Sequence, residues 1–188
     1  MRFADRYLQN RRIAMVRRFI PPGAKILDIG SVDGALFRKL GPVVGAGSMG
    51  IDPTLKASML VNGAELQPGF FPTSMPAAAG PFDVLTMLAV LEHFPEADYE
   101  LLRTGCAAYL RAGGKLLITV PSPQVDYILK WLTFFRVIDG MSLEEHHGYE
   151  TEKTTEIFPP PHFRLVCHRR FQLGLNNLFA LERTNTPA

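Results

Sequence analysis

Two spacings of apolar residues alternate along the chain, one typical of strands and one typical of helices. Short apolar runs between glycine, proline and polar residues predict strands over Lys25–Ile29, Gly47–Ile51, Ala64–Gln67, Phe82–Leu88 and Lys115–Val120. Helical spacing predicts helices over Ala35–Leu40 and Glu96–Arg111, the second ended by Gly113 and Gly114. Strands that alternate with helices in this way are typical of βαβ units around a parallel sheet.

Both ends of the chain differ from this central pattern. Apolar residues spaced among arginines predict an amphipathic helix within residues 1–23, which Pro21-Pro22-Gly23 ends and whose apolar face packs on the core. A second amphipathic segment, Pro121–Ile138, opens a stretch over 121–162 that we expect to cover a ligand site as a lid. Two strand-like segments, Phe163–Phe171 and Asn177–Leu181, then predict a terminal hairpin that turns near Gly174.

Together these elements predict a single α/β domain over residues 1–188. We expect a doubly wound, mostly parallel, seven-stranded sheet with a C-terminal antiparallel hairpin. A chain of 188 residues with 47% hydrophobic and 20% charged residues has the composition of one globular domain. The sequence has no internal repeat and no linker that would divide it.

The net charge and the cysteine content indicate which partners and which cellular compartment the sequence favours. The net charge of +2 and the scattered basic residues do not favour nucleic acid as a partner. No apolar run approaches the roughly 20 residues that cross a bilayer, so we expect no transmembrane segment. Cys106 and Cys167 lack metal-ligand spacing and fit a reducing cytoplasm better than a disulfide framework. The oligomeric state stays open.

The segment after the first predicted strand, Asp28–Gly34, has two glycines where a sharp turn and a close ligand would need them. It lacks the G-x-G-x-x-G pattern of dinucleotide sites, because Val32 replaces the middle glycine and Asp33 places a carboxylate near any phosphate. Asp52 follows Gly30 by 22 residues, near the spacing of about 20 at which an acidic residue binds a ribose diol. A glycine turn and a ribose acid without phosphate chemistry favour a nucleoside ligand, of which S-adenosylmethionine is the common cosubstrate.

Four segments resemble one family, the class I S-adenosylmethionine-dependent methyltransferases, in the small-molecule group that includes quinone-biosynthesis enzymes. The segments are Ile26–Gly34, similar to the motif D-x-G-x-G-x-G; Gly50-Ile51-Asp52, similar to the second motif; Phe82–His93, similar to the fourth-strand motif; and Leu110–Leu116, similar to the L-[KR]-P-G-G turn. Val32 and Ala112 depart from these motifs. The resemblance extends over nearly the whole chain and implies the Rossmann-like methyltransferase fold.

The resemblance also implies a set of cosubstrate-binding residues. Asp28, Gly30, Ser31 and Gly34 would form the glycine loop, which lies under the methionine part of S-adenosylmethionine in this family. Asp52 would hold the ribose. Phe70 or Phe71 would stack on adenine, and Leu88 and Ala89 would contact the methionine moiety.

Methyl transfer from a sulfonium is an in-line displacement, so alignment and exclusion of water count for more than dedicated catalytic groups. For a hydroxyl acceptor a histidine suits the role of general base, and His93, His146 and His147 are the candidates. Glu92 and His93 are equally compatible with capping the next helix. The acids and histidines over 144–150 are typical of a solvated loop, so we expect no metal site. His162 and His168 are expected to be structural.

The sequence leaves three functions to consider. The first is a methyltransferase acting on a small-molecule, sugar or lipid-linked acceptor. The second is a methyltransferase-like binding module without turnover, which Val32 in the glycine loop would favour. The third is a nicotinamide-dependent oxidoreductase, which Val32 and Asp33 oppose because the loop lacks a pyrophosphate-binding glycine.

Overall fold

The computed structural model describes residues 3–122 and 153–185. Helices, 3₁₀ turns and strands follow one another in this order: α1 (Phe3–Arg17), β1 (Ile26–Ile29), α2 (Ala35–Leu40), η1 (Gly41–Val43), β2 (Met49–Asp52), β3 (Met59–Val61), β4 (Ala64–Pro68), β5 (Phe82–Leu88), η2 (Leu91–His93), η3 (Glu96–Asp98), α3 (Tyr99–Tyr109), β6 (Leu110–Pro121), α5 (Lys153–Ile157), β7 (Phe163–Phe171) and β8 (Asn176–Arg183).

The strands form one mixed sheet in the order β3-β4-β2-β1-β5-β6-β8-β7. β4, β2, β1, β5 and β6 are parallel, whereas β8 and β7 run antiparallel and form the C-terminal hairpin. The doubly wound α/β fold with its terminal hairpin is thus confirmed. Strand order reverses beside β1, which in such sheets is the point where ligands bind beyond the carboxyl ends of the strands.

The sheet has eight described strands where the sequence predicted seven, because β3 was missed. β3 has only three residues, two of them exposed, so it lacks the alternation that marks a strand. It pairs antiparallel with β4 through a turn at Asn62 and Gly63, which have φ values of 48° and 82°. The Asn-Gly pair is the sequence signal that predicts such a hairpin.

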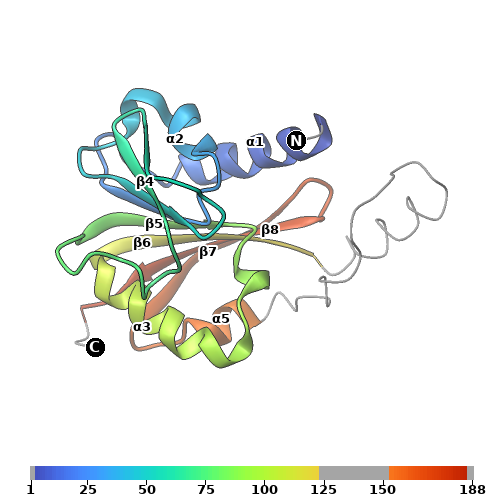
Figure 1. Cartoon of the computed structure of the whole chain (residues 1–188). Helices are drawn as coiled ribbons and strands as arrows, with labels where there is room; N and C mark the ends of the chain where they lie inside the picture. Colours follow the sequence, from blue (N-terminus) through green and yellow to red (C-terminus); the bar gives the residue numbers. More distant parts are fainter. Residues whose placement is uncertain (1–2, 123–152, 186–188) are drawn as a thin grey trace.

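Helices cover both faces of the sheet (Figure 1). On one face α1 and α2 bury Val16 and Phe37 against the sheet, within one of the two apolar clusters of the core. On the other face α3 and α5 bury Leu102 and Ile157 in the second cluster. The predicted N-terminal helix is therefore core-packed, as its apolar spacing indicated. Its α-helical part ends at Arg17, before the two prolines.

The helix predicted over Glu96–Arg111 is shorter than expected. Residues 96–98 form a 3₁₀ turn, α3 ends at Tyr109, and Leu110 already has an extended backbone with a fully buried side chain. Gly113, with a φ of 71°, lies inside β6 where the pairing with β5 shifts register. The two glycines therefore bend the start of a strand, and burial of Leu110 ends the helix before them.

The predicted helix over Pro121–Ile138 falls mainly outside the described residues, as do His146 and His147. The proposed lid over 121–162 therefore stays a prediction. Among the helices that the structure describes, none is long and apolar enough to span a membrane.

Candidate functional site

A cavity of about 550 Å³ lies at the carboxyl ends of the parallel strands. Gly30 after β1, Pro53 after β2, Phe70 after β4 and His93 after β5 all line it, and Leu101 closes it from α3. Its walls are predominantly apolar. Four of the residues predicted for the site, Gly30, Phe70, Phe71 and His93, thus line one cavity from three separate loops.

The glycine loop needs its glycines for two separate reasons. Gly30 and Gly34 both have left-handed backbones, with φ values of 78° and 74°, which side chains other than glycine rarely adopt. A Cβ at Gly30 would also lie 2.3 Å from Cγ2 of Val90, and one at Gly34 would lie 2.9 Å from Cδ2 of Leu66. The loop therefore packs too closely against Val90 and Leu66 to accommodate a side chain at either glycine.

Val32, between the two glycines, also has a left-handed backbone, with a φ of 43°. Its side chain is half-exposed, so little packing offsets the steric cost of this conformation for a β-branched residue. Its backbone N–H donates to Oδ2 of Asp52 at 3.0 Å. The carboxylate of Asp52 thus holds the loop in a conformation that valine itself disfavours.

Val32→Gly is expected to stabilise the chain by about 1 kcal/mol, because relief of roughly 1–3 kcal/mol of backbone strain outweighs the greater entropy of the unfolded glycine. The melting temperature should rise by about 2–4 °C. Val166→Gly is the matched control, since Val166 is also half-exposed but lies in β7, where loss of the side chain should destabilise. A lower melting temperature for both variants would show that Val32 is not strained.

Asp52, at the end of β2, has a buried carboxylate with defined partners. Its Oδ1 accepts hydrogen bonds from the backbone N–H of Thr54 at 2.8 Å and from the Thr54 hydroxyl, while Oδ2 accepts from Val32. Each carboxylate oxygen has two lone-pair sites, so Oδ2 retains the capacity for a further donor. Asp52 does not itself line the cavity, but its neighbours Ile51 and Pro53 do.

Asp28 lies beneath the loop and does not line the cavity. Its Oδ1 accepts a hydrogen bond of 2.6 Å from the hydroxyl of Thr86, on the neighbouring strand β5. Burial raises its pKa to about 7, and the Thr86 hydrogen bond acts in the opposite direction. Asp28 therefore anchors the start of the loop to the sheet.

The remaining predicted cosubstrate residues differ in their surroundings. Phe70 is 67% exposed at the cavity, whereas Phe71 lines its floor with 7% of its surface exposed and its ring 5.9 Å from that of Tyr109. Of the two, Phe70 is therefore the more accessible side chain. Leu88 packs against the apolar cluster that includes Val16 and Phe37, and Ala89, with a φ of 60°, follows β5.

Ser31 does not line the cavity, and two of the three candidate histidines lie outside the described residues. Ser31 is buried, and its hydroxyl has no hydrogen-bond partner in the part of the protein that is described. Of the three candidate histidines, His93 lies at the cavity in the turn η2. His146 and His147 lie outside the described residues, so their proximity to the site stays a prediction.

The surroundings of Glu92, within η2, were not predicted from the sequence. Glu92 was interpreted as a possible cap, but its Oε2 is buried and has no hydrogen-bond partner among the described residues. Burial raises its pKa to about 7, which the charge of Arg12 partly opposes. Arg12 comes from α1 and donates from Nε to Oδ1 of Asn176 at 3.2 Å. Only the tertiary fold joins these elements, and the sequence pattern around Glu92 gave no signal for the contact.

Glu92 should make stability fall as the pH rises. Its folded pKa of about 7 lies above the unfolded value of 4.5, so the fold favours the neutral carboxyl, and that advantage is lost between these two values. Between pH 5 and pH 7 the wild type should lose about 2 kcal/mol relative to Glu92→Gln, with little further change above pH 8. Urea unfolding of both proteins across this range measures the difference. A constant difference would contradict burial of an ionisable Glu92.

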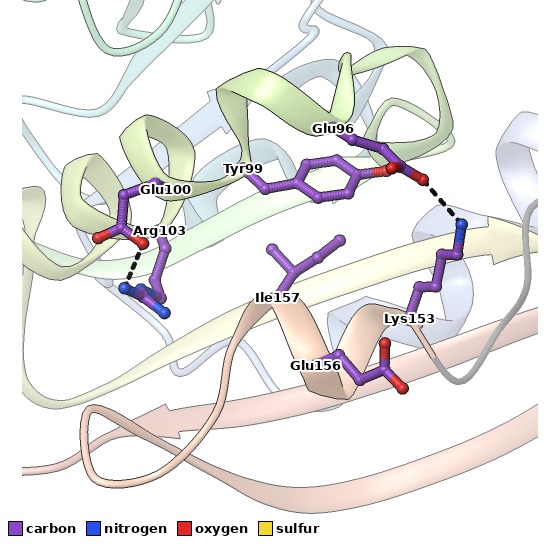
Figure 2. A pocket seen from close by; sticks show the side chains of 7 residues that line it. All are labelled: Glu96, Tyr99, Glu100, Arg103, Lys153, Glu156 and Ile157. Carbon is purple, nitrogen blue, oxygen red and sulfur yellow. Dashed lines mark hydrogen bonds and ion pairs between the residues drawn. The ribbon is translucent and has the colours of Figure 1, made fainter.

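A second cavity, of about 360 Å³, lies between α3 and α5. Figure 2 shows two ion pairs at this cavity: Lys153 Nζ lies 2.8 Å from Oε1 of Glu96, and Arg103 pairs with Glu100. Its lining includes none of the residues predicted for the site. Within residues 3–122 and 153–185, no group of three or more histidines, cysteines or acids is placed to hold a metal ion.

Solved structures share this fold at low sequence identity. Magnesium protoporphyrin IX methyltransferase from Synechocystis, with bound S-adenosylhomocysteine, superimposes with a TM-score of 0.69 at 13% identity over 98% of this chain and 89% of that one. The N-methyltransferase NodS from Bradyrhizobium japonicum gives 0.66 at 13% identity over 96% and 99%. A TehB-like S-adenosylmethionine-dependent methyltransferase from Corynebacterium glutamicum gives 0.65 at 15% identity over 97% and 96%.

A comparison with curated proteins found no match. The sequence does match a family model. The model described as a methyltransferase domain matches residues 2–156, which include the glycine loop, Asp52 and the turn that contains His93. This match covers most of the chain and agrees with the fold and with the resemblance found in the four motifs. The chain therefore belongs to the methyltransferase domain family.

Proposed function

We propose that the protein is an S-adenosylmethionine-dependent methyltransferase that acts on a small-molecule, sugar or lipid-linked acceptor. The observation that carries this proposal is the meeting of Gly30, Phe70 and His93 in one cavity beside the buried carboxylate of Asp52. The family supplies the reaction type. The apolar walls and the few polar groups are what a nucleoside thioether would need, because most of such a ligand's surface is apolar or aromatic.

The residues present fit the cosubstrate on two structural criteria. A Cβ at Gly30 or Gly34 would collide with neighbouring side chains, so the loop keeps a compact backbone that a ligand can approach closely. Asp52 retains acceptor capacity for a ribose hydroxyl, and Phe70 offers an exposed ring for adenine. When bound, S-adenosylmethionine supplies an electrophilic methyl group on its sulfonium.

The chain's own residues contribute alignment and, for an acceptor that must lose a proton, a base. The cavity walls exclude water from the reacting centre, which favours in-line attack. His93 lies at the cavity edge with its side chain exposed, and an imidazole accepts a proton near neutral pH. His93 is therefore the candidate general base among the described residues, and His146 and His147 remain candidates beyond them.

Two other functions have less support. A nicotinamide-dependent oxidoreductase would need a loop that accommodates pyrophosphate, and Asp33 places a carboxylate there that pairs with Arg38. A binding module without turnover is favoured only by the left-handed backbone of Val32. Since Val32 donates its N–H to Asp52, the loop is nevertheless held in the conformation that the cosubstrate would require.

Turnover tests the proposal directly. Purified protein would be incubated with S-adenosylmethionine and with panels of phenols, sugars, amines and isoprenoid-linked acceptors, and S-adenosylhomocysteine would be measured. We expect acceptor-dependent formation of S-adenosylhomocysteine that His93→Gln slows and that His162→Gln, a change in a histidine outside the cavity, leaves intact. Binding of the cosubstrate without turnover on any panel would support the binding module instead.

A further inference from the structure

A third cavity, of about 360 Å³, lies between α1 and α2 beside the glycine loop. Its volume falls within the range of roughly 300–1,000 Å³ that is typical of small-ligand sites. The residues that line it are Arg6, Gln9 and Asn10 from α1, Asp33 from the loop, and Ala35, Arg38 and Lys39 from α2. All of them except the alanine are polar or charged, so this cavity differs in chemistry from the apolar cosubstrate cavity.

The wall that α1 contributes is polar at positions where the helix could have continued its apolar face. Arg6, Gln9 and Asn10 precede the buried Ile13 by seven, four and three residues, a spacing that places all of them on one side of the helix. Ile13 and Val16 pack against the core, whereas the preceding turns present a guanidinium and two amides to the cavity. Polar side chains on the inward face of a helix indicate a site, because packing alone would favour apolar ones.

The charges that line the cavity do not cancel. Asp33 is the one acid among its described lining residues, and Arg38 holds it by donating from Nη1 to the backbone carbonyl and from Nη2 to Oδ2. Arg6 and Lys39 form no ion pair within the part of the chain that the structure describes, and both are exposed. Three cations and one acid therefore leave a net charge of +2 at the cavity.

We propose that this cavity binds a phosphate monoester, with Arg6 and Lys39 as its charge partners and the amides of Gln9 and Asn10 as further donors. At pH 7 such a group carries a charge of about −1.5 to −2 and three strong acceptor oxygens, which match the two cations that lack a counter-charge. A carboxylate or a phosphate diester carries a single charge and would leave one cation uncompensated. A nucleic acid strand would need cations along an extended groove, whereas these converge on one cavity.

The glycine loop contributes to both this cavity and the cosubstrate cavity. Gly30 lines the cosubstrate cavity, and Asp33, three residues later, lines this one. Figure 1 shows the amino-terminal end of α1 on the same side of the molecule as the carboxyl end of β6. A ligand held here by its phosphate would thus lie next to the loop assigned to the cosubstrate. The inference itself rests on the cavity and its charges and does not depend on methyl transfer.

The test distinguishes two sources of a phosphate monoester, a soluble phosphorylated molecule and the headgroup of phosphatidic acid. Inorganic phosphate and glycerol 3-phosphate would be titrated at constant ionic strength into the isotope-labelled full chain, and backbone amide chemical shifts in α1 and α2 would report binding. Dimethyl phosphate, a diester with one charge, is the ligand control. Sedimentation with phosphatidylcholine vesicles, with and without phosphatidic acid, tests the lipid source.

Arg6→Gln and Lys39→Gln each remove one charge from the cavity. Arg11→Gln and Lys56→Gln are matched controls, because they remove exposed cations that do not line it. We expect each cavity variant to weaken glycerol 3-phosphate by about 3-fold or more and the double variant by about 10-fold, since single exposed charge pairs contribute modestly. Each control should change the affinity by less than about 1.5-fold, and thermal melts verify that all variants are folded.

Binding of glycerol 3-phosphate that depends on Arg6 and Lys39 and exceeds that of dimethyl phosphate would support the site with a soluble ligand. The same dependence in sedimentation with phosphatidic acid vesicles would support it with a lipid headgroup. Equal affinities for glycerol 3-phosphate and dimethyl phosphate, equal losses in cavity and control variants, or no binding of any phosphate monoester would overturn the assignment.

Discussion

Asp52→Ala is expected to weaken S-adenosylmethionine and S-adenosylhomocysteine by at least about 100-fold. Two ribose hydrogen bonds to a charged acceptor would be lost, each worth about 1.5–3 kcal/mol, and 1.4 kcal/mol corresponds to a factor of ten. The change also removes the acceptor for the Val32 N–H, so the glycine loop loses a contact that orders it. Titration calorimetry of the wild type and the variant measures both effects together.

Two controls separate these effects. Asp33→Ala removes a half-exposed carboxylate from the same loop, where it pairs with Arg38, and should change affinity by less than about 3-fold because exposed pairs contribute little. Asp52→Asn keeps an oxygen for Val32 and isolates the loss of charge at the ribose. Unchanged binding to folded Asp52→Ala would remove Asp52 from the cosubstrate site.

Gly30→Ala should cost about 3 kcal/mol of stability. The left-handed backbone, at a φ of 78°, contributes about 1 kcal/mol, and the Cβ would lie 2.3 Å from Val90, a clash whose relief costs about 1–3 kcal/mol more. For a chain of this size the melting temperature should fall by about 6–12 °C. Any displacement of Val90 also changes the wall of the cavity, so binding of S-adenosylhomocysteine should decrease as well.

Gly23→Ala is the matched control for this prediction. Gly23 has nearly the same φ, 75°, but a Cβ there would meet nothing within 4 Å, so only the backbone cost of about 1 kcal/mol should appear. The double variant Gly30→Ala/Val90→Ala should regain most of the additional loss in a double-mutant cycle. Equal costs at Gly23 and Gly30, or no coupling with Val90, would refute the close approach.

The central pattern of the sheet could be predicted from sequence because each of its signals is local. A strand such as Phe82–Leu88 is an uninterrupted apolar run, and Gly30, Gly34 and Asp52 follow strands directly, so their place at the carboxyl edge follows from the topology. Two predictions, the absence of a strand at β3 and the end of the helix α3, were wrong. β3 is too short and too exposed to alternate, and burial of Leu110 ended α3 before the two glycines.

The site residues could be predicted from the sequence only where they lie within one loop. Choosing between Phe70 and Phe71 required the fold, because neighbouring positions in one loop differ almost tenfold in exposure. The electrostatic effect of Arg12 on Glu92 and the hydrogen bond from Arg12 to Asn176 gave no signal in the sequence, since both depend on how α1 packs in the fold. Contacts between segments that are distant in the sequence leave no periodic spacing of residues from which they could be predicted.

The binding preference of the cavity tests the central claim most directly. S-adenosylhomocysteine and NADH would be titrated in parallel into the purified wild-type chain. The account predicts saturable binding of S-adenosylhomocysteine and none of NADH, because Asp33 and the loop at Val32 disfavour a pyrophosphate. Binding of NADH without binding of S-adenosylhomocysteine would contradict the account and assign the glycine loop to a dinucleotide.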